Sequence, residues 1–217
     1  MGRVEEFVNS ERNRYGKAFV DVNYAIDNIS PFLEKNDLKR RKYVTKLPIL
    51  KRYMDLLDAA EAEGKKGGFM NMFHNDKSID LLRDYKSDNI DSLNQLEKCK
   101  DCACLNCTAE CAFNGCIGCR AGSHIEKCDH SKISLTLHES YSLELTNDRT
   151  GRMDRYTVLA TLQDAELDRQ YIIIENKMNG EKFILYYYPG IAEDNYGEIT
   201  DSEEFDFIVE TFEGVNS

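Results

Sequence analysis

The organisation of the chain is set by residues 99–130, which read CKDCACLNCTAECAFNGCIGCRAGSHIEKCDH. This stretch holds all eight cysteines of the 217-residue chain and two of its four histidines. Three Cys-x-x-Cys pairs and one Cys-x-His pair recur in it, a spacing that lets two ligands reach one metal ion. We therefore predict a compact metal site whose candidate ligands are Cys99, Cys102, Cys104, Cys107, Cys111, Cys116, Cys119, Cys128, His130 and His124.

Zinc is the metal that this ligand set favours. Structural zinc takes four tetrahedral ligands from thiolates and imidazoles, so the set can hold roughly two to three ions. An iron–sulfur cluster is the alternative, but the ferredoxin run C-x-x-C-x-x-C-x-x-x-C ends in proline, whereas the intervals here are two, one, two, three, four, two and eight residues without proline. A disulfide framework would need an oxidising compartment. Separate tetrahedral sites and a cluster with bridging thiolates both fit, and we expect a cross-braced pair in which alternate Cys pairs share an ion.

The metal segment is interpreted as structural rather than catalytic. A coordination sphere rich in thiolates is closed, whereas catalytic zinc keeps an open position. The main apolar residues of the segment, which are Ala112, Phe113, Ile117 and Ile125, are too few to build a core. Metal binding therefore supplies the free energy that folds it.

Catalytic motifs are not found in the sequence. It contains no glycine-rich phosphate loop, no G-x-S-x-G elbow and no H-E-x-x-H helix. His74 and His138 stand alone and are interpreted as surface or packing residues. No catalytic residue is assigned, and an enzyme is the least favoured class.

Residues 1–98 are predicted to form a helical bundle. Along 4–29 a buried face repeats at steps of four and three residues, with one polar exception at Glu11. Its positions are Val4, Val8, Glu11, Tyr15, Ala18, Val22, Ala25 and Ile29. Apolar residues keep helical spacing again over about 48–63 and from about residue 76 into Cys99, which predicts a three-helix bundle or a long antiparallel hairpin.

Residues 131–217 are predicted to form an antiparallel sheet with one C-terminal helix. Alternating apolar and polar residues or apolar runs indicate strands at 133–137, 141–145, 156–162, 171–174 and 183–188. Asn179-Gly180 signals a hairpin turn. A capping residue among 200–202 starts the helix, and its apolar face consists of Phe205, Ile208, Val209 and Phe212.

The net charge of −11 lies in the last part of the chain. Residues 131–217 hold 7 Lys and Arg against 18 Asp and Glu, a balance of −11, whereas residues 1–98 hold 18 against 17. An acidic surface repels nucleic acid and favours a basic partner. Another protein is therefore the expected partner.

Two further segments are candidates for partner contacts. A basic cluster within 35–46 is either a solvated loop or a contact with nucleic acid or an acidic protein, and its assigned residues are Lys39, Arg40, Arg41 and Lys42. An apolar segment beside a glycine run either packs under the bundle or forms an adaptable contact loop. Its assigned residues are Phe69, Met70, Met72 and Phe73.

Residues 155–214 resemble the small acidic bacterial domain of unknown function called YrzB-like. The resemblance rests on the order of YTVLA at 156–160, YIII at 171–174, KFILY at 182–186 and EEFDFI at 203–208. It implies a small sheet with a C-terminal helix and no known activity. The helical and cysteine-rich parts have no counterpart in that family.

The sequence therefore predicts an α+β protein with a helical bundle at 1–98, a zinc-stapled connector at 99–130 and an acidic β domain at 131–217. No apolar run spans a membrane and the N-terminus lacks a signal-peptide core, so the expected location is the cytoplasm. The function we expect is that of a non-enzymatic zinc-binding interaction or regulatory protein. The alternatives are a nucleic-acid- or ribosome-associated zinc protein using 35–46 and a thiol-based redox or metal-sensing switch.

Overall fold

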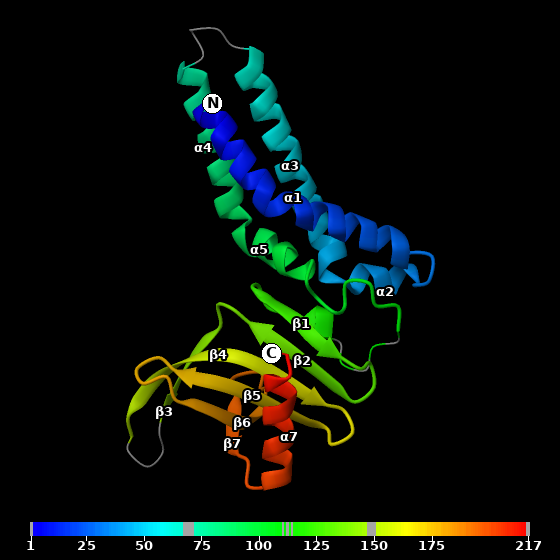
Figure 1. Ribbon diagram of the computed structural model, residues 1–217, viewed down its shortest axis with the longest axis vertical. Coiled ribbons are helices and arrows are strands. Elements are labelled where there is room, and N and C mark those ends of the chain that lie inside the picture. Colours follow the sequence, from blue (N-terminus) through cyan, green and yellow to red (C-terminus); the bar gives the residue numbers. More distant parts are fainter. Residues whose placement is uncertain are drawn as a thin grey trace. The chain divides into compact units, whose positions relative to one another are not determined.

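The computed structural model has the predicted α+β architecture, with helices first and an antiparallel sheet after them (Figure 1). It describes residues 2–66, 72–109, 111, 113, 115–146 and 151–215. The chain divides into two compact units. The helical unit is Met1–Asp101 with Leu105–Thr108, and the sheet unit is Cys102–Cys104 with Ala109–Ser217. The cysteine-rich segment is thus shared between the units.

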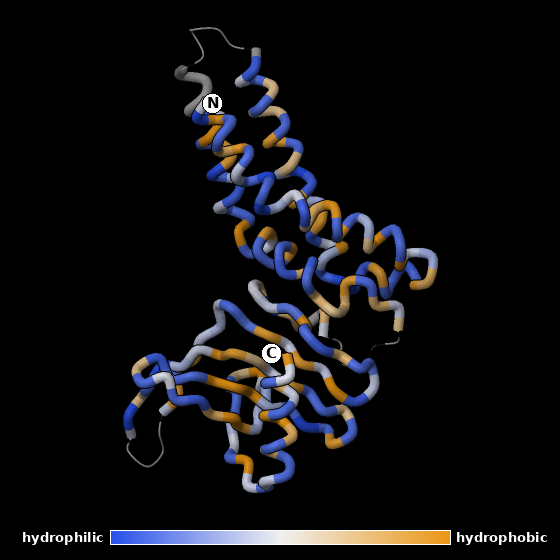
Figure 2. Tube along the Cα trace, in the orientation of Figure 1, coloured by the Kyte–Doolittle hydropathy of each residue, from blue (hydrophilic) through white to orange (hydrophobic). Residues whose placement is uncertain are grey.

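The helical unit contains α1 (Arg3–Ile29), α2 (Lys35–Arg40), α3 (Lys42–Lys66), α4 (Met72–Asp88) and α5 (Ile90–Cys99). All the predicted inward positions of α1 are buried, including Glu11. Figure 2 shows the resulting alternation of hydrophobic and hydrophilic residues along this helix. The heptad-like pattern therefore identified the buried face of α1 correctly.

Helix α2 was not predicted, and α4 begins at Met72 rather than near residue 76. Two further helix boundaries differ from the prediction. α3 begins at Lys42, so Pro48 lies inside the helix instead of starting it. Tyr43 is only 1% exposed, and burial of this ring explains the longer helix. The predicted third helix is split at Asn89, whose φ of −120° interrupts it between α4 and α5. The Asn89 side chain donates from Nδ2 to the Tyr85 carbonyl at 2.9 Å.

A polar network lies inside the helical unit. The Glu11 carboxylate accepts hydrogen bonds from Tyr53 Oη at 2.6 Å and from Lys86 Nζ at 2.8 Å. The Tyr53 ring stacks on Tyr85 and meets Tyr15 edge-on, with centroids 5.9 and 5.8 Å apart. The polar exception in the apolar stripe is therefore a buried acceptor that joins three helices.

The sheet unit is built on a seven-stranded antiparallel sheet. Its strands are β1 (Ser123–Cys128), β2 (Ile133–His138), β3 (Ser142–Thr146), β4 (Met153–Asp164), β5 (Arg169–Asn176), β6 (Lys182–Tyr188) and β7 (Asn195–Glu198). The order is β1-β2-β4-β5-β6-β7, and β3 also pairs with β4. The long β4 pairs with β3 along its first half and with β2 along its second half.

Two strands were not predicted. β1 reads SHIEKC and β7 reads NYGE, and neither sequence alternates apolar and polar residues. The β5–β6 hairpin was predicted, and Gly180 in its turn has a φ of +73°, a conformation that glycine adopts without strain. Polar strands of this kind are recognised by their hydrogen-bonded pairing with a neighbouring strand and not by an alternating sequence pattern.

Helix α7 (Ser202–Glu213) packs on one face of the sheet. Asp201 caps it, accepting from the amides of Glu203 and Glu204 at 2.9 and 3.1 Å. The Glu204 carboxylate then accepts from Tyr171 Oη at 2.5 Å and Tyr186 Oη at 2.9 Å. Burial opposes ionisation of Glu204, but these bonds and the Arg169 guanidinium hold the pKa of Glu204 below its usual value. This carboxylate therefore fastens the start of α7 to β5 and β6.

Replacing Glu204 with alanine is expected to lower the free energy of unfolding by about 2 kcal/mol, because two tyrosine hydroxyls lose their acceptor. The effect should be present above about pH 4.5 and should fade as the pH falls through the lowered pKa of Glu204. Urea unfolding at pH 7 and pH 3 measures both. Equal stability of the variant and the parent at pH 7 would show that the carboxylate does not hold α7.

Candidate metal centre

The outer edge of β1 carries the first group of candidate ligands. The segment Cys102–Cys104 runs beside this edge, where the Ala103 amide donates to the Ile125 carbonyl at 2.8 Å. Cys104 and Ile125 are buried, and Cys102 is half-buried. The chain therefore places Cys102 and Cys104 against the middle of β1.

Cys102 lies in surroundings that favour its thiolate. Its pKa is lowered to about 6, first by a side-chain hydrogen bond from Cys104. Burial opposes this shift, while the backbone amides of Cys104 and Ile125 donate to the sulfur and His124 adds a favourable charge interaction. Amides that point at a cysteine sulfur stabilise the form of the side chain that binds metals.

A second Cys pair reaches the same part of β1. The short turn of helix α6 (Gly115–Gly118) carries Cys116 and leads to Cys119. A Cβ atom at Gly115 would lie 2.6 Å from Ile125 Cδ1, so glycine permits this close approach. Cys119 Sγ lies 3.3 Å from the Ser123 carbonyl, at the start of β1.

His124 has the hydrogen-bonding pattern of a metal ligand. Its Nε2 lies 2.9 Å from Glu126 Oε2, and a carboxylate acceptor fixes the proton on Nε2. In the neutral form of the ring, which is the form that binds a metal, Nδ1 is then the acceptor. It is buried and has no hydrogen-bond partner within the described part of the chain. A histidine that donates one ring nitrogen to a carboxylate and keeps the other for the metal is the usual arrangement in zinc sites.

These side chains form what we call the β1-edge cluster. Each member lies on β1, contacts it, or is next in sequence to a residue that contacts it. They are Cys102, Cys104, Cys116, Cys119 and His124.

A separate pair lies at the other end of β1. The His130 amide donates to Cys128 Sγ at 3.4 Å, and His130 Nδ1 is 4.0 Å from the same sulfur. Five residue steps separate Ser123 from Cys128, which is about 16 Å along a strand. Sulfurs on one zinc ion lie about 4 Å apart. Cys119 and Cys128 therefore cannot share an ion while β1 is extended.

The remaining cysteines are placed individually. Cys99 is buried at the end of α5, where Gln95 Nε2 lies 3.7 Å from its sulfur, and Cys111 is exposed. Cys107 belongs to a turn that is anchored on the helical unit. Tyr43 Oη donates to the Leu105 carbonyl at 3.1 Å, and Arg41 Nη2 donates to the Cys107 carbonyl at 3.2 Å.

The candidate partner residues have different environments. Arg41 is only 7% exposed, so it serves the turn at 105–108 and does not belong to an exposed basic surface. Lys39 and Arg40 are exposed on α2, and Lys42 is half-buried at the start of α3. Among the apolar candidates, Phe69 and Met70 lie outside the described residues. Met72 and Phe73 lie in the α4 backbone, but their side chains are outside the description.

Taken over residues 2–66, 72–109, 111, 113, 115–146 and 151–215, no three His, Cys, Asp or Glu side chains are already arranged to hold a metal ion. The β1-edge cluster is therefore defined by what each member contacts. Zinc binding there requires its side chains to rotate toward one point.

His138, interpreted from the sequence as a surface or packing residue, packs within the sheet unit. Its Nδ1 lies 2.7 Å from Ser123 Oγ and its Nε2 lies 3.0 Å from Thr161 Oγ1. Burial, followed by the charges of Arg120 and His124, lowers the pKa of His138 to about 4. The folded protein thus holds this imidazole neutral.

A neutral His138 makes stability depend on pH. The unfolded chain binds a proton near pH 6.5 and the folded chain only near pH 4, so the contribution is complete above pH 6.5 and is lost as the pH falls toward 4. Between pH 7.5 and 5 the loss should be about 2 kcal/mol. Urea unfolding of the parent and of His138→Gln measures the difference, and the variant should have the flatter profile. Parallel profiles would contradict the neutral imidazole.

Comparisons with known proteins give no relative for this fold and site. No family model, no curated protein and no solved structure matches the chain. The resemblance of residues 155–214 to the YrzB-like domain stays a prediction. Within the described residues, no helix is long and apolar enough to cross a membrane.

Proposed function

We propose that the protein is a non-enzymatic zinc-binding interaction protein whose zinc ions hold residues 102–130 in shape. The observation that carries this proposal is His124, which keeps a buried ring nitrogen without a hydrogen-bond partner among the described residues and interacts with Cys102 of the β1-edge cluster. Its other nitrogen is bonded to Glu126, as in zinc sites. Three thiolates with His124 make a tetrahedral Cys3His site.

A structural role for zinc is supported by the small apolar core of residues 102–130. Between residues 102 and 130, Leu105 and Ile125 are the buried apolar residues besides cysteine among the side chains that the structure describes. A segment of this size with so small a core needs a metal to fold. Ligands that are mostly thiolates also leave no open position for a substrate.

The geometry supports two zinc sites rather than one mixed cluster. The β1-edge cluster supplies the first, and Cys128 with His130 supplies ligands to the second, because β1 separates them. This division agrees with a cross-braced arrangement, because Cys116 with Cys119 and Cys128 with His130 then belong to different ions. The cytoplasm, where thiols stay reduced, is the compartment that suits such sites.

Zinc content tests the proposal directly. The purified protein should carry two to three zinc ions per chain by native mass spectrometry and elemental analysis. His124→Gln should lose one ion or bind it at least tenfold more weakly, whereas His138→Gln, a matched change on the neighbouring strand, should keep the parent content. A brown protein with iron and acid-labile sulfide would contradict zinc, and full zinc content in both variants would remove His124 from the site.

A further inference from the structure

The face of the sheet that carries α7 is only partly covered by that helix. Cross-strand register defines a row formed by Leu135, Leu162, Tyr171 and Tyr186, in which the first three are buried and Tyr186 is half-buried. Ile208 of α7 is fully buried in the same core cluster. This cluster also contains Ala160 and Ile173 of the next row.

Part of the next row on the same face lines an open groove. Register places Leu137, Ala160, Ile173 and Ile184 side by side across β2, β4, β5 and β6. Ala160 and Ile173 in its middle are buried, and Leu137 and Ile184 at its ends are half-buried and line the groove with Ile173. Leu159, at the irregular step of β4, lines the groove as well. The groove encloses about 610 Å³, which is in the range of sites that bind ligands.

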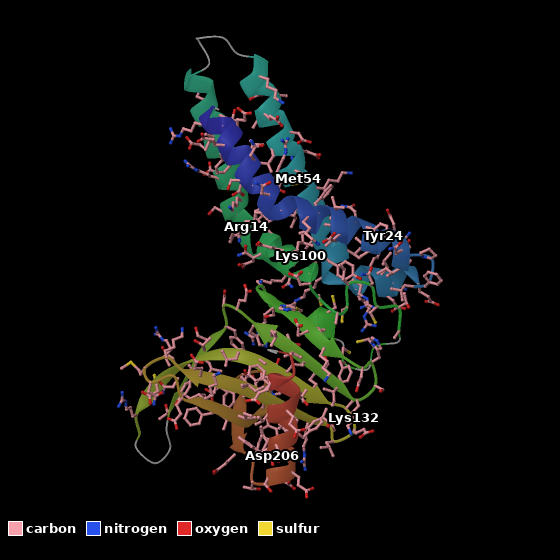
Figure 3. All side chains as sticks on the ribbon, in the orientation of Figure 1. Arg14, Tyr24, Met54, Lys100, Lys132 and Asp206 are labelled. Atoms are coloured by element: carbon pink, nitrogen blue, oxygen red, sulfur yellow. The ribbon has the colours of Figure 1, made fainter. Side chains whose placement is uncertain are left out.

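One side of α7 forms the wall of this groove. Phe205, Val209 and Phe212 follow each other at steps of four and three residues, so they share one side of the helix. All three line the groove, and Phe205 remains 39% exposed. Figure 3 labels Asp206 on the same helix, and neither Asp206 nor Glu210 lines the groove.

The rim of the groove is acidic. Glu139, Glu175 and Glu213 line it together with a single lysine, Lys182, which pairs across the strands with Glu175. Two histidines, His124 and His138, complete the polar lining. The surrounding region, residues 131–217, has a balance of −11. An apolar lining inside an acidic rim is complementary to a partner with an apolar face and positive charges.

We propose that this groove docks a basic amphipathic helix of a protein partner. A sheet face is normally covered by whole layers of helix, whereas Leu137, Leu159 and Ile184 beside α7 stay half-buried and line the groove. The apolar face of the partner helix contacts this apolar lining and the α7 wall, and its lysines or arginines meet the three glutamates. The proposal rests on the interaction role proposed above, and the groove shares one lining residue, His124, with the candidate metal centre.

The probe for the test is a synthetic, fluorescently labelled helix of about 20 residues with leucine on one face and lysine on the other. The full-length, zinc-loaded protein should bind it in a fluorescence anisotropy titration, with affinity that falls as salt rises. A helix of the same pattern with glutamate in place of lysine should bind at least tenfold more weakly.

Variants distinguish the groove from general attraction to an acidic protein. Glu139→Lys with Glu213→Lys should weaken binding about tenfold, and Phe205→Ser should weaken it severalfold with a smaller change in salt dependence. The matched control is Asp206→Lys with Glu210→Lys, which makes the same change of charge on α7 outside the groove and should change affinity less than twofold. Circular dichroism confirms that each variant is folded.

Two results would contradict docking of a basic helix in the groove. Equal weakening by the groove and control pairs would reduce the binding to net charge and overturn the proposal. Binding of the apolar dye ANS without binding of the basic helix would assign the groove to a small molecule instead. Zinc content is measured on the same samples, so loss of helix binding with full zinc, or the reverse, separates this proposal from the metal site.

Discussion

Replacing Cys116 and Cys119 with serine is expected to remove one zinc ion and to expose residues 102–130 to proteases. Cys116 lies on α6, which approaches Ile125 at Gly115, and Cys119 follows this helix with its Sγ against the Ser123 carbonyl. Structural zinc contributes about 10–16 kcal/mol of binding free energy in small zinc domains, so its loss outweighs any single contact of this segment. Far-UV circular dichroism should be largely kept, because the helical unit and the sheet have their own cores.

Limited proteolysis and zinc analysis measure this effect together. New cleavage should fall between residues 102 and 130. The matched control is Cys128→Ser with His130→Gln, which should release a different ion, so that combining the two pairs of changes removes both. If the Cys116 and Cys119 variant stayed compact and resistant to protease, the structural role of zinc would be wrong, and a sensing role would become the better hypothesis.

Replacing Glu11 with alanine is expected to lower the free energy of unfolding by about 3 kcal/mol. Glu11 is 7% exposed and accepts from both Tyr53 and Lys86. Alanine leaves the Tyr53 hydroxyl and the Lys86 ammonium without their acceptor in the interior of the helical unit. Chemical denaturation followed by circular dichroism at 222 nm measures the loss.

Two conservative variants show which contact of Glu11 causes this loss of unfolding free energy. Glu11→Gln keeps an acceptor for Tyr53 and should be less destabilising than alanine, while Tyr53→Phe removes one partner and should cost about 1 kcal/mol. A double change of Glu11→Ala with Tyr53→Phe should cost less than the sum of the single changes, because the hydroxyl is no longer left unpaired. Additive losses would show that the hydrogen bond does not carry the effect.

The helical unit could be predicted where burial follows a period. Every inward position of α1 was identified, even Glu11, because its polar side chain kept the register of its apolar neighbours. The start of α3 was misplaced because Pro48 favours the first turn of a helix, whereas burial of Tyr43 extends the helix backward. Arg41 was grouped with exposed basic residues because sequence does not reveal the carbonyl of Cys107 that it contacts.

The candidate metal centre was predicted as a set of residues and not as an arrangement. Spacing predicted ten candidate ligands, but β1, the strand beside which several of them lie, has no apolar alternation of its own. Ile125 was noted only as an apolar residue, yet its carbonyl and amide position Cys102 and its side chain packs at Gly115. The groove beside α7 depends on cross-strand register, which no single segment of sequence encodes.

X-ray absorption at the zinc edge of the purified protein reports directly on the ligands of the proposed zinc sites. We expect a first shell dominated by sulfur at about 2.3 Å with a minor nitrogen contribution at about 2.0 Å, which decreases in His124→Gln. A shell of six oxygen ligands, iron with iron–iron scattering, or a spectrum unchanged in His124→Gln would contradict this expectation.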